Sequence, residues 1–158
     1  MKRLFILTGA PGAGKSTWAK QYQEEHENVY IISSDAIRYE LTGCFNDHSK
    51  QKLVWETFEN RIHEYANKGN DITVILDALC DLNSLRIKYV KENPEYDEYT
   101  LVVFPRSFEY VQKWNKERPQ EKWVPDDILI SLFNKYEKPS AEALSYFQKV
   151  LIIEEEVK

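Results

Sequence analysis

Short apolar runs alternate with amphipathic segments along most of the chain. In the segment 49–68, for example, Val54, Phe58 and Ile62 recur at helical spacing and line one face. The apolar runs have the length of buried strands, and they cover residues 3–8, 29–33, 72–76, 100–104 and 150–153. This alternation predicts an α/β sandwich with a parallel sheet of about five strands and helices on both faces.

Start and stop signals delimit the expected helices. Ser33 or Ser34 can cap a helix that begins near Asp35, and Pro125 suits a first helical turn. Gly69 is suited to end the long helix before it. Besides the helix near Asp35, we expect helices at residues 15–25, 49–68, 85–91, 107–116, 125–136 and 140–147.

The clearest chemical signal is an eight-residue run that matches G-x-x-x-x-G-K-[ST] at every position: Gly9, Ala10, Pro11, Gly12, Ala13, Gly14, Lys15 and Ser16. Its glycines allow successive backbone N–H groups to point at phosphate oxygens, next to the positive end of a helix. Lys15 supplies a charge for the β- and γ-phosphates, and Ser16 supplies a hydroxyl ligand for Mg²⁺. We therefore expect this run and Thr17 to bind ATP, with Mg²⁺ as cofactor.

The sequence does not support assignment to another class of P-loop protein, such as the GTPases. The Asn-Lys pairs at Asn67, Asn115 and Asn134 are not followed by the Asp of the guanine-reading NKxD motif. A small kinase is the better interpretation, because Asp35 and Arg38 lie three residues apart on a first helical turn. We expect them at the carboxyl end of a strand next to the P-loop strand, where a base and an anion-binding group can act.

Several segments resemble the kinase domain of phage-type 5′-hydroxyl polynucleotide kinases and related bacterial polynucleotide kinase modules. They are residues 9–17 (GAPGAGKST), 33–43 (SSDAIRYELTG), 74–78 (VILDA) and 115–126 (NKERPQEKWVPD). The resemblance implies that Asp35 is the general base for a 5′-OH and that Arg38 engages the acceptor's phosphate. It further implies that Arg118 contacts the ATP phosphates, and that Asp77 assists the metal directly or through water.

The resemblance also implies a lid near residues 114–124, called the predicted lid below. We expect Trp114 and Trp123, which flank it, to pack at a hinge or in the core rather than stack on a base. Arg86 and Arg106 are expected at the surface. After Asp77 the chain departs from the family pattern, and it lacks the D-x-D-x-[TV] signature of the phosphatase domain of the bifunctional phage enzyme.

Length, composition and charge limit the domain organisation and the cellular location that we expect. A length of 158 residues and an apolar share of 42% suit a single kinase domain over residues 1–158. No apolar run approaches a membrane span and the start is no signal peptide, so we expect a cytoplasmic protein without a membrane partner. Cys44 and Cys80 form no CxxC pair and predict idle thiols. The net charge of -5 leaves only a local basic site for nucleic acid.

The sequence thus predicts an ATP-dependent polynucleotide 5′-hydroxyl kinase, which transfers the γ-phosphate of ATP to a 5′-OH end of DNA or RNA. A kinase of a nucleoside or another small hydroxyl metabolite stays open, and the absence of an overall basic face favours it slightly. A non-catalytic ATP-binding regulatory module is a further alternative, but it leaves Asp35 and Arg38 without a function.

Overall fold

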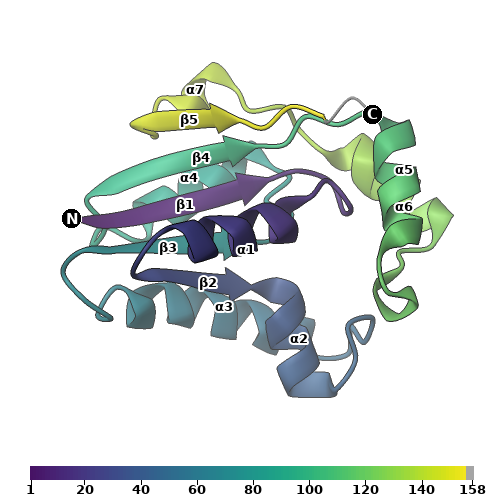
Figure 1. The fold of residues 1–158 in the computed structure, drawn as a ribbon, viewed down its shortest axis with the longest axis horizontal. Helices are drawn as coiled ribbons and strands as arrows, with labels where there is room; N and C mark the ends of the chain where they lie inside the picture. The colour runs from purple at the N-terminus through teal and green to yellow at the C-terminus, as the bar shows by residue number, and fades with distance from the viewer. Residues whose placement is uncertain (156–158) are drawn as a thin grey trace.

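The computed structural model describes residues 1–155, and at the centre of this part of the chain lies a five-stranded sheet (Figure 1). Its strands are β1 (Lys2–Thr8), β2 (Val29–Ser33), β3 (Ile72–Asp77), β4 (Glu98–Val103) and β5 (Lys149–Ile152). They lie in the order β2-β3-β1-β4-β5, and each neighbouring pair is parallel. The predicted α/β class and strand number are therefore confirmed.

Helices cover both faces of the sheet, with α1 on one face and α3 and α4 on the other (Figure 1). The helices are α1 (Lys15–Glu25), α2 (Ser34–Thr42), α3 (Gln51–Tyr65), α4 (Asn83–Lys91), α5 (Phe108–Glu117), α6 (Asp126–Lys135) and α7 (Ala141–Leu144), and a 3-10 turn covers Gln120–Lys122. Helix α3 is shorter than predicted, because the N–H groups of Asn67 and Lys68 bond three residues back instead of four. Within residues 1–155, no helix has the length and apolar character that crossing a membrane requires.

The two faces of β1 belong to different parts of the core. Leu4 and Ile6 pack with residues of α3 and α4, whereas Phe5 and Leu7 pack with residues of α1. All four side chains are buried, because both faces of a parallel sheet with helical crossovers are covered. This arrangement explains why the apolar runs of the sequence show no polar alternation.

The carboxyl ends of the strands bring the candidate site residues to one edge of the sheet. Strand β3 lies between β1 and β2, and its last residue, Asp77, pairs with Ser33 of β2. The prediction that the strand preceding Asp35 lies next to the P-loop strand was therefore wrong. Strand order depends on how the crossover helices pack, which no local sequence pattern encodes. As a result, Asp77 lies on the strand beside the glycine loop, and Asp35 follows a strand one position further out.

Candidate active site

The glycine loop joins β1 to α1 and has the backbone conformation that its sequence predicts. Gly12 and Gly14 have φ angles of 79° and 96°, in a region that residues with a side chain rarely adopt. A Cβ at Gly9 would lie 3.0 Å from Cβ of Phe104, so this position also has little room. The loop ends at the first turn of α1, whose backbone N–H groups have no partner within the helix. Together these features form an anion-binding cradle.

Lys15 is buried at the centre of this cradle. Its Nζ donates hydrogen bonds to the carbonyl oxygens of Gly9, at 2.8 Å, and Ala10, at 3.0 Å. Burial lowers the pKa of Lys15 to about 8, and the nearby carboxylates of Asp77 and Asp35 oppose this shift. The ammonium group is therefore costly to keep in the folded protein and is ready to bind an anion that would stabilise its charge.

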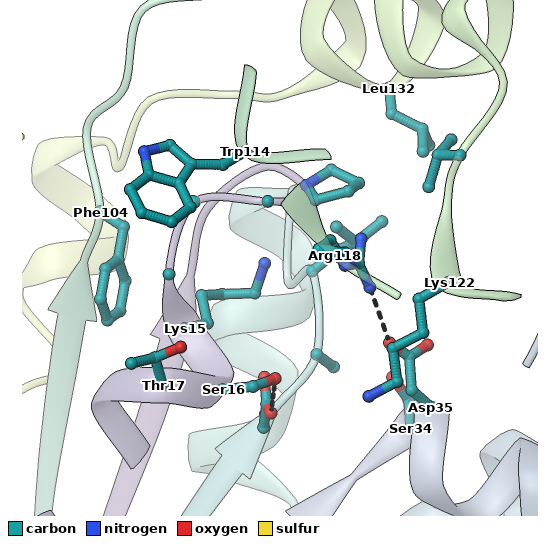
Figure 2. A pocket seen from close by; sticks show the side chains of 18 of the residues that line it. Lys15, Ser16, Thr17, Ser34, Asp35, Phe104, Trp114, Arg118, Lys122 and Leu132 are labelled. Carbon is teal, nitrogen blue, oxygen red and sulfur yellow. Dashed lines mark hydrogen bonds and ion pairs between the residues drawn. The ribbon is translucent and has the colours of Figure 1, made fainter. Parts of the chain in front are cut away.

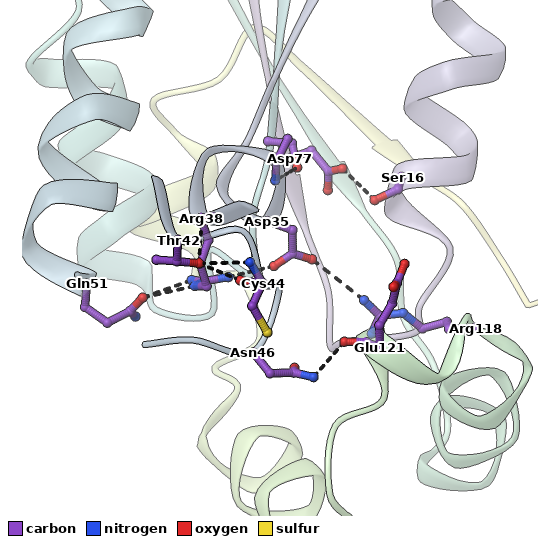
Figure 3. Close-up of polar contacts among 12 residues, drawn as sticks. Ser16, Asp35, Arg38, Thr42, Cys44, Asn46, Gln51, Asp77, Arg118 and Glu121 are labelled. Carbon is purple, nitrogen blue, oxygen red and sulfur yellow. Dashed lines mark hydrogen bonds and ion pairs between the residues drawn. The ribbon is translucent and has the colours of Figure 1, made fainter. Parts of the chain in front are cut away.

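Ser16 and Asp77 bring a hydroxyl and a carboxylate together beside Lys15. The Ser16 hydroxyl donates to Oδ2 of Asp77 at 2.6 Å (Figure 3). Burial raises the pKa of Asp77, and the Lys15 charge and the Ser16 hydrogen bond oppose that shift. A hydroxyl and a carboxylate at this spacing suit Mg²⁺, which takes only one or two protein carboxylates and completes its shell with phosphate oxygens and water. Among residues 1–155, no three His, Cys, Asp or Glu side chains gather as a metal site.

A cleft of about 810 Å³ opens above the glycine loop. One of its walls includes Asp35 of α2 and Trp55 of α3, and the opposite wall includes Trp114 of α5 and Leu132 of α6. Figure 2 shows Lys15 on the floor of this cleft. The cleft therefore extends from the glycine loop to the first turn of α2.

Asp35 lies in the cleft between two arginines. The Ser33 side chain accepts a hydrogen bond from the N–H of Ala36 and caps α2, which places Asp35 on the first turn. Oδ1 of Asp35 accepts a hydrogen bond from Nη1 of Arg38 at 2.8 Å, and Oδ2 lies 3.7 Å from Nη2 of Arg118 (Figure 3). Arg38 comes from the same helix, whereas Arg118 reaches over from the predicted lid. The structure thus brings together Asp35, Arg38 and Arg118, which the sequence predicted as the base, the group that engages the acceptor's phosphate and the lid arginine.

The surroundings of Arg38 differ from those of a free anion-binding group. Its side chain is only 7% exposed, whereas the Asp35 side chain is 45% exposed. Its Nε and Nη2 donate to Oε1 of Gln51, at 3.2 and 3.1 Å, while Nη1 is used by Asp35. In this geometry the guanidinium group orients the Asp35 carboxylate toward the cleft.

The surface positions expected for Arg106 and Arg86 were wrong. Arg106 is half-buried and lines the cleft, and its Nε donates to the carbonyl of Ala13 in the glycine loop at 3.0 Å. Arg86 is fully buried, and its Nη2 donates to the Thr8 hydroxyl at 2.9 Å and to the Glu137 carbonyl at 2.7 Å. Both guanidinium groups therefore brace the residues around the glycine loop. The signal in the sequence for Arg106 was its place just beyond the carboxyl end of β4, whereas Arg86 lies within α4 and had no such signal.

The two tryptophans that flank the predicted lid have different surroundings. Trp123 is half-buried, and its Nε1 donates to the Arg118 carbonyl at 2.7 Å, which fits the hinge packing expected for it. Trp114 instead lines the cleft on the side of Phe104 (Figure 2). In the described part of the chain neither ring belongs to an apolar core cluster.

Known proteins share this sequence pattern over most of the chain. Residues 3–144 match the family model described as chromatin associated protein KTI12. The L-seryl-tRNA(Sec) kinase of Methanococcus maripaludis is 27% identical over 150 residues, which is 88% of this chain and 54% of that protein. The chain spans about half the length of the curated relatives it matches.

Solved structures show the same fold. The Kti12 structure of Chaetomium thermophilum in complex with ADP-AlF3 has a TM-score of 0.69 at 17% identity, over 96% of this chain and 88% of that chain. A chain of the Pnkp1/Rnl/Hen1 RNA repair complex has a TM-score of 0.71 at 23% identity, over 85% of this chain and 43% of that chain. These likenesses confirm a P-loop kinase fold. They do not confirm the narrower resemblance to phage-type polynucleotide kinases. Because the family model covers most of its length, the chain is a P-loop kinase-like protein of the KTI12 family.

Proposed function

We propose that this protein uses ATP and Mg²⁺ to transfer a phosphoryl group to a hydroxyl at the 5′ end of a polynucleotide. The observation that carries the proposal is the Asp35 carboxylate, which is 45% exposed and lines the same cleft as the glycine loop. Phosphate binding has no use for a carboxylate at this place. A hydroxyl group that enters the cleft can instead give its proton to this side chain, which Arg38 holds in position.

The nucleotide end of the reaction follows from the glycine loop. We infer that the backbone N–H groups of residues 12–16 and the Lys15 ammonium bind the ATP phosphates. Ser16 and Asp77 would hold Mg²⁺, which supplies neutralisation of the charge on the β- and γ-phosphate oxygens when it is bound. The Asp77 carboxylate would serve this site and not proton transfer, because Ser16 and Lys15 are its neighbours.

The transfer step itself involves Asp35 and Arg118, which come from the two walls of the cleft. The acceptor oxygen attacks the γ-phosphorus while its proton passes to Asp35, and the bond to the bridging β–γ oxygen breaks to release ADP. Arg118 lies 3.7 Å from Asp35, so its guanidinium group can stabilise charge on the phosphoryl oxygens during transfer. Asp35 afterwards releases its proton to the solvent.

The acceptor end of the cleft supports a polynucleotide substrate. Lys122 and Arg118 lie there together with the aromatic ring of Trp55. Cations and aromatic faces are the two kinds of group with which proteins bind single-stranded nucleic acid. The similarity to an enzyme named for its action on seryl-tRNA is consistent with an RNA-linked hydroxyl.

The test is phosphoryl transfer from γ-labelled ATP to a panel of 5′-OH oligonucleotides, the matching nucleosides and sugars. We expect kcat/KM for an oligonucleotide to exceed that for its nucleoside at least about tenfold, since the nucleoside has no phosphate to bind. Asp35→Asn should retain ATP binding and lose about 10²–10⁴ in kcat. Asp127→Asn, on an exposed position of α6, is the matched control. Equal use of nucleosides or sugars would instead assign a small hydroxyl acceptor.

A regulatory ATP-binding module without transfer is the second candidate. It is favoured by the arginines on both sides of Asp35, because Arg38 already donates to Oδ1 and Arg118 faces Oδ2, which leaves less of the carboxylate free to accept from an acceptor hydroxyl. In that case ATP binding would still require Lys15, but no acceptor of the panel would be phosphorylated. Asp35→Asn would then leave ATP hydrolysis unchanged.

A further inference from the structure

The predicted lid is held by the opposite wall of the cleft through two residues of the loop between α2 and α3. Resting on the proposed function, we propose that Phe45 and Asn46 are positioning residues, which hold the tip of the lid across the cleft and thereby place Arg118 at the transfer site. Neither residue needs to touch the nucleotide or the acceptor for this role.

The base of the lid is closed by Asn115. This residue is fully buried, its Nδ2 donates to the Val124 carbonyl at 2.7 Å, and its Oδ1 accepts from the Val124 N–H at 2.9 Å. Inside the lid, the Trp123 side chain is bonded to the Arg118 carbonyl, and Lys116 lies 4.8 Å from the centre of the Trp123 ring. The lid is therefore a preformed unit, and its attachment at the far end decides where Arg118 lies.

The tip of the lid has its anchor on the α2–α3 loop. The 3-10 turn Gln120–Lys122, as the structure describes it, contains no buried residue, so core packing does not hold it. Nδ2 of Asn46 donates to the Glu121 carbonyl at 2.6 Å, and Nζ of Lys122 lies 4.5 Å from the centre of the Phe45 ring. Figure 3 shows the Asn46 side chain directed at Glu121 across the gap. Two neighbouring loop residues thus bind two neighbouring lid residues.

The anchor is itself fixed to the helix that carries the base. The Phe45 ring stacks on Tyr39 with their centres 4.7 Å apart, and Tyr39 belongs to α2, as Asp35 and Arg38 do. The position of the lid tip is therefore fixed by contacts that lead to α2 and not by contacts with the distant sheet. This explains how Arg118, from the other wall, comes within 3.7 Å of Asp35.

Both contacts are at the surface and weak enough to break and re-form. The Asn46 hydrogen bond is solvent-exposed and the cation–π contact joins two half-buried side chains, and interactions of these kinds each change an opening equilibrium about two- to tenfold. Such a lid is held shut most of the time and still opens for substrate entry, as lids of phosphotransferases must.

The first experiment measures lid opening without any need for activity. Asn46→Ala, Phe45→Leu and the double variant are compared with wild type by trypsin cleavage after Lys122 under native conditions. Cleavage of a transiently opened segment follows the population of its open form. We expect the rate to rise about two- to tenfold in each single variant and more than about tenfold in the double variant. Cys44→Ser and Gln120→Ala are controls from the same two segments, and they should stay within about twofold of wild type.

The second experiment asks whether the lid places Arg118. We expect kcat to fall in the double variant, in proportion to the share of the lid that has left the closed state, while Kd for ATP stays unchanged because the glycine loop is intact. An unchanged cleavage rate in the double variant overturns the proposal, and so does increased cleavage with unchanged kcat. If wild type phosphorylates no acceptor, the proposed function fails, and the cleavage experiment alone decides whether Phe45 and Asn46 hold the lid.

Discussion

The guanidinium group of Arg118 lies 3.7 Å from the carboxylate of Asp35, although the two side chains come from opposite walls of the cleft (Figure 2). Asp35 is fixed on the first turn of α2, and Arg118 immediately follows α5. A phosphoryl group in transit between ATP and an acceptor hydroxyl would lie near both. We can therefore predict separately how nucleotide binding and transfer to the acceptor depend on particular residues.

Replacing Arg118 should affect catalysis far more than nucleotide affinity. We expect Arg118→Ala to lower kcat by about 10³-fold or more, because arginines that meet charge only during transfer contribute at this scale. Kd for ATP should change only a few-fold, since Lys15 and the glycine loop remain. Rapid-quench measurement of a single turnover, with Lys113→Ala on the exposed side of α5 as control, checks this. Similar rates for both variants would contradict the role of Arg118.

ATP affinity should decrease as the pH rises above about 8. Burial lowers the pKa of Lys15 to about 8, and only its protonated form can bind phosphate as an ammonium ion. Above that pH, the free protein loses the proton progressively, so Kd should rise up to about tenfold per pH unit. Binding of a fluorescent ATP analogue from about 1.5 pH units below the pKa of Lys15 to about 1.5 pH units above it measures this. Lys15→Met should bind weakly without this dependence, and a flat wild-type profile would refute the assignment.

Arg38 should act on catalysis through Asp35 and not through the acceptor's phosphate. Its guanidinium group already bonds to Asp35 and Gln51 and is almost completely buried. We therefore expect Arg38→Gln to lower kcat about equally for an oligonucleotide and for its nucleoside, by about tenfold or more. The measurement is the ratio of the two kcat/KM values. A loss confined to the oligonucleotide would show that Arg38 binds a phosphate, as the family resemblance implies.

Arg86 should matter for stability. Arg86→Ala removes hydrogen bonds to Thr8 and Glu137 and leaves a cavity, so we expect the free energy of unfolding to fall by about 2–4 kcal/mol. Arg3→Ala is the matched control, because the Asp71 partner of Arg3 is 75% exposed and their pair should contribute less than about 1 kcal/mol. Urea denaturation of both variants gives the comparison. Equal losses would mean that the buried network contributes nothing beyond a surface pair.

The sequence predicted best what depends on neighbouring residues. The φ angles of Gly12 and Gly14 and the cap at Ser33 follow from local backbone chemistry, and the motif or the residue type announces them. Strands β1, β3 and β4 were found because most of their residues are buried on both faces, which leaves an uninterrupted apolar run. The meeting of Asp35 with Arg38 likewise needed only their spacing on one helix.

What the sequence did not predict depends on segments far apart in the chain. The position of β3 between β1 and β2 arises from the packing of whole crossovers. Arg86 is buried because residues near Glu137, about fifty positions later, pass over it. The contacts of Phe45 and Asn46 with the lid join residues about 75 positions apart and involve side chains that have no chemical signature of their own.

Asn115 has a consequence for how members of such a family can diversify. A single buried amide side chain joins the two ends of the excursion formed by residues 116–123. Lengthening a surface excursion whose ends already meet adds little closure entropy, and it leaves the sheet and the glycine loop undisturbed. The residues of this segment other than Arg118 can therefore be lengthened or replaced as one unit, without a change in the core of the protein that holds the glycine loop.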